Sequence, residues 1–512
     1  MINAIIGLLG VVGIVYASSF DGTYVLDDDL ILEQRYVHPY SSWGHFLRDS
    51  RQLVDLSFWA NYHFNGFDPW GYHLVNLLVH LASVLCVFSI GLWATELWAT
   101  HEFAKPVESN LEDKGNHQTS IWPAWWIAVL WGVHPLTTES VTYIIQRYES
   151  VAVLFMLLTL RCWCGLLDGK RSAAIGVIFF AWCAILSKQI SISLPFLIFV
   201  WDLFFSRLRG GAAIGNFSKH RLKALRTIAW GGILSAWSYL VLCLSGYLFA
   251  MVPTVGSEYA ARSIHHELSP LQYLQTQSVV ILHYMKLVLY PRDLRLDYGW
   301  MPEHDPLRYI PAMCLLASLA LLGIWLFYHR KCAGILIVMV YLTLAPRSSF
   351  APSPDMVFEH RMYFPLVFLV ALLVVGGVAL RRTMVSMRQV IRLIGVGLLL
   401  MWGMRTHQRN LDYQSTVRFW QSNFDLEPNN PRVAHNLGMA YASLGDWKTA
   451  RVYAETAVSQ NDKYAGYYIG LGDTQRETGD PVAAIKSFSR AIELEPESGE
   501  ASRLRLGTSR KD

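Results

Sequence analysis

Residues that could do chemistry gather in a few short stretches of this chain. The stretch YVLDDDL carries Asp27, Asp28 and Asp29 in a row, shortly after an apolar segment. Adjacent carboxylates repel one another, which raises the pKa of one of them. If this loop is pinned in place, it could supply a general base or a metal ligand. A solvated turn would explain the same three residues, so the stretch alone leaves both interpretations open.

Other ionisable residues stand within or beside apolar runs, where they are costly and are functional candidates by default. They are His134, Glu139 and Arg147 in HPLTTESVTYIIQR, Lys188 in LSKQ, Glu359, His360 and Arg361 in FEHRMYFP, and Arg51 just before the second apolar run. Arginine suits phosphate because its planar fork binds two oxygens, so Arg51 and Arg361 are candidate phosphate contacts. Structural alternatives are an internal Glu139–Arg147 ion pair and a Lys188 side chain that snorkels to the membrane surface.

The elements that must position these residues are membrane helices. Of 512 residues, 53% are hydrophobic and only 16% are charged, whereas soluble domains carry about 25% charged residues. A bilayer core requires roughly 20 apolar residues in a helix. Eleven apolar runs approach that length: 2–20, 71–99, 121–136, 149–167, 172–187, 190–206, 227–251, 307–328, 332–346, 362–380 and 391–404. We expect about eleven crossings, with the run 268–290 lying in the interface or re-entering from the outer side.

Positive charge predicts which side each loop occupies, because cytoplasmic loops are rich in lysine and arginine. Four basic clusters begin at Lys170, Arg207, Arg330 and Arg381. Placing all four in the cytoplasm puts the aspartate stretch, the other candidate residues and the C-terminal part outside it. The net charge of +4 is spread along the chain, so we expect membrane lipids and no nucleic acid among the partners.

The positions of the cysteines and the absence of nucleotide-binding and zinc-protease motifs argue against several kinds of site. All seven cysteines lie in or beside apolar runs, which argues against a disulfide framework and a zinc site. The chain has no phosphate-binding loop, no dinucleotide fingerprint and no H-E-x-x-H motif. The sequence assigns no cofactor, and a divalent metal ion on the acidic loop stays an open alternative.

A repeat of 34 residues marks the C-terminal part. Gly438 recurs as Gly472, and Gly445 recurs as Gly479. A period of 34 with Gly-Asp between two helices is typical of the tetratricopeptide repeat. We therefore expect a transmembrane domain over 1–405 and a tetratricopeptide domain over 406–512, with two full repeats at about 430–497 after a leading partial repeat. Such arrays bind peptides or proteins.

The ordered motifs resemble one protein family over nearly the whole chain. They are YVLDDD, GYHLVNLLVH, HPLTTESVTYIIQR, LSKQISISLP, YPRDLRLDYGW and FEHRMYFP, followed by the repeats. This series resembles the TMTC-like membrane glycosyltransferases of superfamily C, which are related to the protein O-mannosyltransferases. The resemblance implies an all-α superfamily C helix bundle followed by a short α-solenoid. It also implies a lipid-phosphate sugar donor and transfer to a protein hydroxyl outside the cytoplasm.

The sequence looks closer to bacterial relatives, which implies an undecaprenyl-type donor, an inner-membrane location and a periplasmic repeat domain. By this resemblance Asp28 is the expected base, with Asp27 second. Donor handling falls to His134, Glu139, Arg147, Lys188, Glu359, His360 and Arg361, with Arg51 nearby. The expected reaction is an inverting sugar transfer. The alternatives are a membrane-anchored repeat scaffold without catalysis and, ranked last, a transporter.

Overall fold

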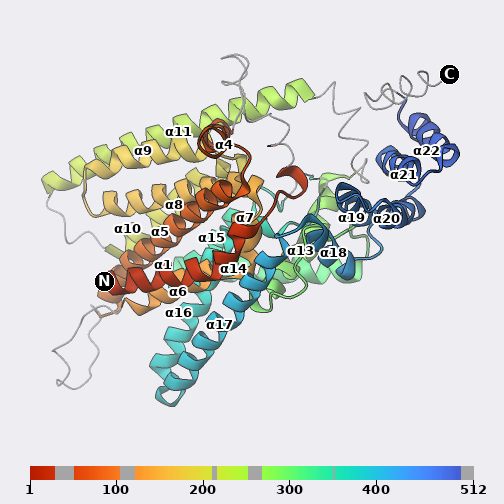
Figure 1. Ribbon diagram of the computed structural model, residues 1–512. Coiled ribbons are helices and arrows are strands. Elements are labelled where there is room, and N and C mark those ends of the chain that lie inside the picture. Colours follow the sequence, from red (N-terminus) through yellow and green to blue (C-terminus); the bar gives the residue numbers. More distant parts are fainter. Residues whose placement is uncertain are drawn as a thin grey trace.

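The computed structural model describes residues 1–28, 31, 51–103, 121–209, 216–251, 268–349, 352–353 and 355–496. Every regular element in these ranges is a helix, which confirms the all-α prediction (Figure 1). The helices of the bundle are α1 (Ile2–Tyr16), α4 (Gln52–Asn65), α5 (Pro69–Phe103), α6 (Trp122–Gly132), α7 (Thr138–Val141), α8 (Arg147–Leu167), α9 (Ser172–Ile185), α10 (Leu194–Arg209), α11 (Asn216–Met251), α13 (Pro270–Leu289), α14 (Pro306–Tyr328), α15 (Cys332–Leu344), α16 (Pro365–Thr383) and α17 (Arg388–Asp412). The C-terminal helices are α18 (Thr416–Leu426), α19 (Pro431–Ser443), α20 (Trp447–Gln460), α21 (Ala465–Glu477) and α22 (Pro481–Leu494).

Seven segments among the described residues are long and apolar enough to cross a membrane. They include most or all of α1, α5, α8, α10, α11, α14 and α16. The four other expected spans correspond to α6, α9, α15 and α17. Helices α6, α9 and α15 have 11, 14 and 13 residues, fewer than the roughly 20 that a bilayer core requires. The expected total of about eleven crossings therefore stays a prediction.

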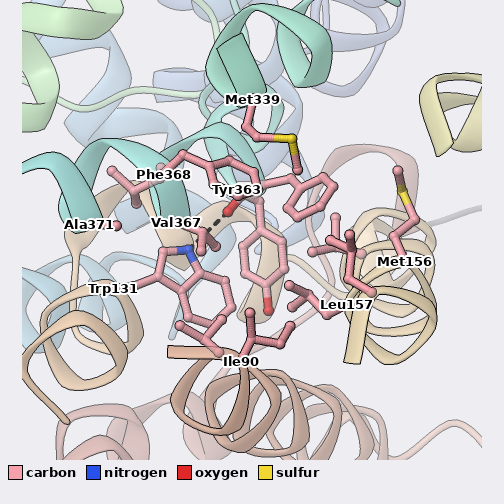
Figure 2. Packing of buried hydrophobic residues seen from close by; sticks show 14 of the residues in the cluster. Ile90, Trp131, Met156, Leu157, Met339, Tyr363, Val367, Phe368 and Ala371 are labelled. Atoms are coloured by element: carbon pink, nitrogen blue, oxygen red, sulfur yellow. Dashed lines mark hydrogen bonds between the residues drawn. The ribbon is translucent and has the colours of Figure 1, made fainter. Parts of the chain in front are cut away.

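The largest hydrophobic core lies where α5, α6, α8, α15 and α16 meet (Figure 2). Trp131 and Tyr363 lie at its centre, and the indole Nε1 of Trp131 donates to the carbonyl of Tyr363 at 2.9 Å. The Tyr363 hydroxyl and His80 Nδ1 are 2.8 Å apart, and His80 Nε2 lies 2.9 Å from the Gly132 carbonyl. These bonds confirm that His80 links helices within the bundle. They also fix Tyr363, which stands two residues after Arg361.

The C-terminal helices form paired hairpins with matching turns. Gly445 and Gly479, 34 residues apart, both adopt the left-handed conformation, with φ of +79° and +85°. Glycine adopts this region without steric cost, which explains its place at the end of a helix. Asp446 and Asp480 each cap the following helix through a backbone N–H three residues on. The repeat predicted from the sequence therefore appears as α19–α20 and α21–α22.

The first C-terminal helices pack directly on the bundle. A second apolar cluster joins Val25 of the aspartate loop, Tyr143, Leu296, Trp420 of α18 and Leu437 of α19. Figure 1 shows α18 and α19 beside the bundle, with α21 and α22 extending away from it. The array is thus attached on the face of the bundle that carries the aspartate loop.

Candidate active site

The aspartate loop holds its two described acids in different environments. Asp28 is fully buried, and its oxygens accept the backbone N–H groups of Val25 at 3.1 Å and of Ile145 at 2.7 Å. The Asp27 side chain is exposed, while its backbone N–H donates to the Tyr143 hydroxyl at 3.1 Å. Asp29 lies outside the described residues. Asp28 therefore ties the loop to the start of α8, and Asp27 is the acid that faces outward.

The backbone just before these two acids adopts an unfavourable conformation. Leu26 has a φ of +48°, in the left-handed region that bulky L-residues rarely occupy. A single residue in this region costs about 1–2 kcal/mol. Strained residues of this kind cluster at functional sites, and here the strained residue immediately precedes Asp27 and Asp28.

A cluster of cations is attached to Gln146, the residue that follows Ile145, to which Asp28 binds. The Lys188 ammonium is 2.8 Å from Glu149 Oε2 and donates to Gln146 Oε1 at 3.1 Å. Arg347 approaches the same Glu149 oxygen at 3.3 Å. Because Gln146 follows Ile145, the residue bound by Asp28, one short segment connects the aspartate loop to the cations.

Arg361 completes the cluster and shares a pocket with Glu149 and Arg347. The cavity itself measures about 10 Å³, within about 340 Å³ of empty space that includes the open solvent in front of it. Buried polar atoms normally have hydrogen-bond partners, yet Arg361 Nε and Ser348 Oγ have none among the described residues. The other wall is largely apolar and is formed by Met156, Ile190, Leu344, Phe364 and Pro365. Cations and unsatisfied polar atoms against an apolar wall fit a ligand that joins an anion to a hydrocarbon chain.

Three contacts with its own loop and one with α13 hold the Arg361 side chain. Nη1 donates to the Met356 carbonyl at 3.0 Å and lies 3.4 Å from the Tyr273 hydroxyl. Nη2 donates to the Asp355 carbonyl at 2.7 Å and to Ser353 Oγ at 3.3 Å. A guanidinium fixed in this way is pre-organised for an anion, because little side-chain freedom is lost on binding.

Glu139 pairs with His360 of the FEHRMYFP stretch. Glu139 Oε1 lies 2.6 Å from His360 Nδ1, and Oε2 accepts the His360 backbone N–H at 2.8 Å. Burial raises the pKa of Glu139, and the neighbouring Glu359 raises it further. Burial lowers the pKa of His360, and the nearby Lys188 acts in the same direction. The Glu139–His360 pair is therefore favoured as a neutral support, and Glu139 does not pair with Arg147 as one alternative had it.

Two expected site residues lie away from the pocket. Arg147 is completely buried; its Nε donates to Asn76 Oδ1 at 2.6 Å, and its guanidinium stacks 4.4 Å from the Phe58 ring centroid. His134 Nε2 contacts the Val288 carbonyl at 3.0 Å, and its Nδ1 accepts the Leu136 N–H. Both side chains connect elements of the bundle, so the structure gives them structural contacts and no access to the pocket.

Arg51 lies at the edge of the cation cluster. Its guanidinium is 5.1 Å from the centroid of the Tyr148 ring. Its charge also contributes to lowering the pKa values of Lys188 and Arg347. The structure thus brings Lys188 and Arg361 together with Arg51 nearby.

Sequence reasoning missed Arg347 and did not assign Glu149 a role. Arg347 follows directly on the apolar run 332–346 at its expected outer end. The reasoning that selected Lys188, an isolated cation at the outer end of an apolar run, applies equally to Arg347 and would have found it. Among the described residues, no three His, Cys, Asp or Glu side chains are close enough together to hold a metal ion.

The chain is similar to several O-mannosyl-transferases. It is 24% identical to human protein O-mannosyl-transferase TMTC4, with 87% of this chain and 65% of the relative covered. For human TMTC3 the identity is 21%, covering 96% of this chain and 55% of the relative. For Xenopus laevis tmtc2 it is 28%, covering 32% and 18%. The chain therefore spans less than two thirds of the length of these relatives.

A second comparison concerns the C-terminal part alone. The family model of the tetratricopeptide repeat matches residues 465–498. This range contains α21 and α22, the second of the two helical hairpins. The chain thus resembles the TMTC protein O-mannosyl-transferases over most of its length and ends in tetratricopeptide repeats.

Proposed function

We propose that this chain is a membrane glycosyltransferase that moves a sugar from a polyprenyl-phosphate donor to a protein hydroxyl. The observation that carries the proposal is that the aspartate loop and the cation cluster bind to consecutive residues of the chain. Asp28 binds the backbone of Ile145, and Lys188 binds the side chain of the next residue, Gln146. An acid loop and a cation cluster held this close together are what a group transfer between a hydroxyl and a phosphate ester requires.

The pocket matches the charge that forms in such a reaction. Arg347 and Arg361 of the pocket and Lys188 beside it supply three cations around Glu149, which offsets one of them and leaves a net charge of +2. A sugar phosphodiester carries one negative charge, and the departing phosphate monoester carries about two. Preorganised charge of this kind stabilises the leaving group more than the ground state, which is how it lowers the barrier. The apolar wall would take the first isoprene units of the lipid.

We assign the base to Asp27 and not to Asp28. Both oxygens of Asp28 are occupied by backbone N–H groups in a fully buried position. A base must come within hydrogen-bond distance of the acceptor hydroxyl, and of the two described acids of this loop Asp27 is the one with an exposed side chain. Asp28 acts by holding the loop.

In the proposed reaction, the Asp27 carboxylate takes the proton of the acceptor hydroxyl. The hydroxyl oxygen forms a bond to the anomeric carbon while the bond from that carbon to the phosphate oxygen breaks. The electron pair leaves with the phosphate, which Lys188, Arg347 and Arg361 stabilise. A single displacement of this kind inverts the anomeric configuration.

The partners follow from the comparisons and from charge. The names of the relatives specify mannose and a protein acceptor, and the tetratricopeptide array offers a surface for such a protein. The positive-inside count supports a catalytic face and a repeat domain outside the cytoplasm. We propose an undecaprenyl-type donor and a bacterial inner membrane with the repeats in the periplasm.

The test compares cells with and without this chain for lipid-linked sugars and glycoproteins. We expect one polyprenyl-phosphate sugar to accumulate and one protein glycan to disappear when the chain is absent. The Asp27→Asn variant should reproduce the loss although it is present at wild-type level. An unchanged set of sugars and glycans would support the non-catalytic scaffold instead, whereas full complementation by Asp27→Asn would remove Asp27 as the base.

A further inference from the structure

Two adjacent parts of the candidate site are tied to the tetratricopeptide array. The first tie runs through Glu359, whose Oε1 accepts the Arg295 backbone N–H at 2.7 Å and the Tyr298 hydroxyl at 2.8 Å. The Arg295 guanidinium in turn reaches α18, where it contacts Glu427 at 2.7 Å and the Leu426 carbonyl at 3.1 Å. One residue therefore bonds to the site with its backbone and to the array with its side chain.

The second tie runs through Asp355. Its backbone carbonyl accepts Arg361 Nη2 at 2.7 Å, and its side chain pairs with Arg432 of α19 at 3.1 Å. Arg432 also pairs with Asp297, two residues after Arg295. Arg432 thus joins the two loops that hold Glu359 and Arg361.

These contacts go beyond what attachment of a binding domain requires. Anchoring alone is already provided by the shared apolar cluster, in which Leu296, Trp420 and Leu437 pack together. The polar ties add orientation, because each ends on the loop beside a residue of the site. Among the described residues, the hydrogen-bond partners of Arg361 Nη2 are Ser353 Oγ and the Asp355 carbonyl.

We infer that helices α18 and α19 position the donor-phosphate arginine Arg361, so that the start of the array is part of the donor site. The inference rests on the proposed function. In this arrangement Arg432 is a positioning residue: it holds Asp355, and Asp355 holds Arg361. Loss of the Arg432–Asp355 pair frees Asp355 and spreads the Arg361 guanidinium over several orientations, only some of which meet the phosphate.

The alternative role for Arg432 is capture of the acceptor, since tetratricopeptide arrays bind peptides. The two roles differ when no acceptor is present. A positioning residue changes the affinity for the lipid phosphate alone, whereas an acceptor contact leaves that affinity unchanged. Binding of undecaprenyl phosphate to the full chain in detergent, without any acceptor, therefore separates them.

The experiment measures this affinity for wild type, Arg432→Ala, Asp355→Asn and the double variant. We expect each single variant to weaken binding about fivefold, since partly exposed ion pairs contribute modestly. The double variant should be no weaker than the single ones, because both act through one pair. Arg451→Ala is the matched control: Arg451 pairs with Glu455 and Asp480 inside the array, and its loss should leave binding unchanged.

Each outcome decides the question. Wild-type affinity in both Arg432→Ala and Asp355→Asn would overturn the inference while leaving the proposed function intact. Equal weakening by Arg432→Ala and Arg451→Ala would also overturn it, because a general loosening of the array would then be the cause. No binding by the wild-type chain would overturn the proposed function and this inference with it. Asp355→Asn lies outside the array, so the test survives if Arg432→Ala unfolds the repeats.

Discussion

Replacing Arg347 by alanine tests the residue that the sequence did not reveal. Arg347 lines the pocket beside Arg361 and contacts Glu149 at 3.3 Å, and its side chain is 26% exposed. The substitution removes one of three cations and lowers the net charge of the pocket from +2 to +1. The lipid-phosphate donor should therefore be bound and cleaved less well, while the helices around the pocket stay folded.

The size of the effect follows from the contacts. A hydrogen bond to a charged group contributes about 1.5–3 kcal/mol, which corresponds to a fall in kcat/KM for the donor of roughly 10- to 150-fold. Glu149 is 3% exposed and still has Lys188 at 2.8 Å, so it does not become an unpaired buried charge.

The assay follows transfer or slow hydrolysis of a labelled polyprenyl-phosphate sugar by the purified chain, over a range of donor concentrations. Arg308→Ala is the matched control, because Arg308 is 70% exposed and pairs with Glu303 at 3.5 Å away from the pocket. Thermal unfolding in the same detergent reports on folding. Wild-type kinetics in Arg347→Ala would refute the charge argument.

Three further predictions concern residues already placed. Asp27→Asn should abolish transfer with unchanged donor binding. Asp28→Asn should instead lower the thermal midpoint, because it leaves a buried N–H group unpaired at a cost of about 1–3 kcal/mol in folding free energy. The reverse pattern would assign the base to Asp28. Burial lowers the pKa of Lys188 to about 7, although Glu149 opposes this shift. Because the ammonium loses its proton as the pH rises through that value, the KM for the donor should rise above pH 7. Lys188→Arg should flatten this pH profile, because a guanidinium stays protonated. Arg147→Ala should reduce stability by more than about 3 kcal/mol, since it removes a buried charged side chain and its contacts, with no selective rise in the donor KM of the folded fraction; a selective rise would place Arg147 at the donor.

The fold class could be predicted from the sequence because its signals are local. Apolar runs and a 34-residue period depend on neighbouring residues, and the repeat fixes Gly445 and Gly479 at equivalent turns. The number of crossings is harder to predict, because a helix such as α9, with 14 residues, is too short to be recognised by length. Its apolar composition does not say whether it crosses or ends inside the bundle.

The candidate site could be predicted only in part because its partners are distant in the chain. Spacing alone suggested that Glu139 and Arg147 share a helix face. In the structure this segment is not one continuous helix but is divided into η3 (Pro135–Thr137), α7 and η4 (Ile144–Gln146). As a result, Glu139 pairs with His360, and Arg147 donates to Asn76. No local pattern reports a contact between residues 221 positions apart.

Ile145 and Gln146, which anchor the aspartate loop and Lys188, are consecutive residues, and this limits how far apart the loop and the lysine can lie. Consecutive Cα atoms lie about 3.8 Å apart, so the loop that carries Asp27 and the ammonium of Lys188 cannot separate without breaking a hydrogen bond. In the proposed reaction, the two consecutive anchors would then limit the space for a sugar ring. Variants that accept a bulkier sugar should therefore arise by trimming the pocket wall, and those that alter the two anchors should lose discrimination and rate together.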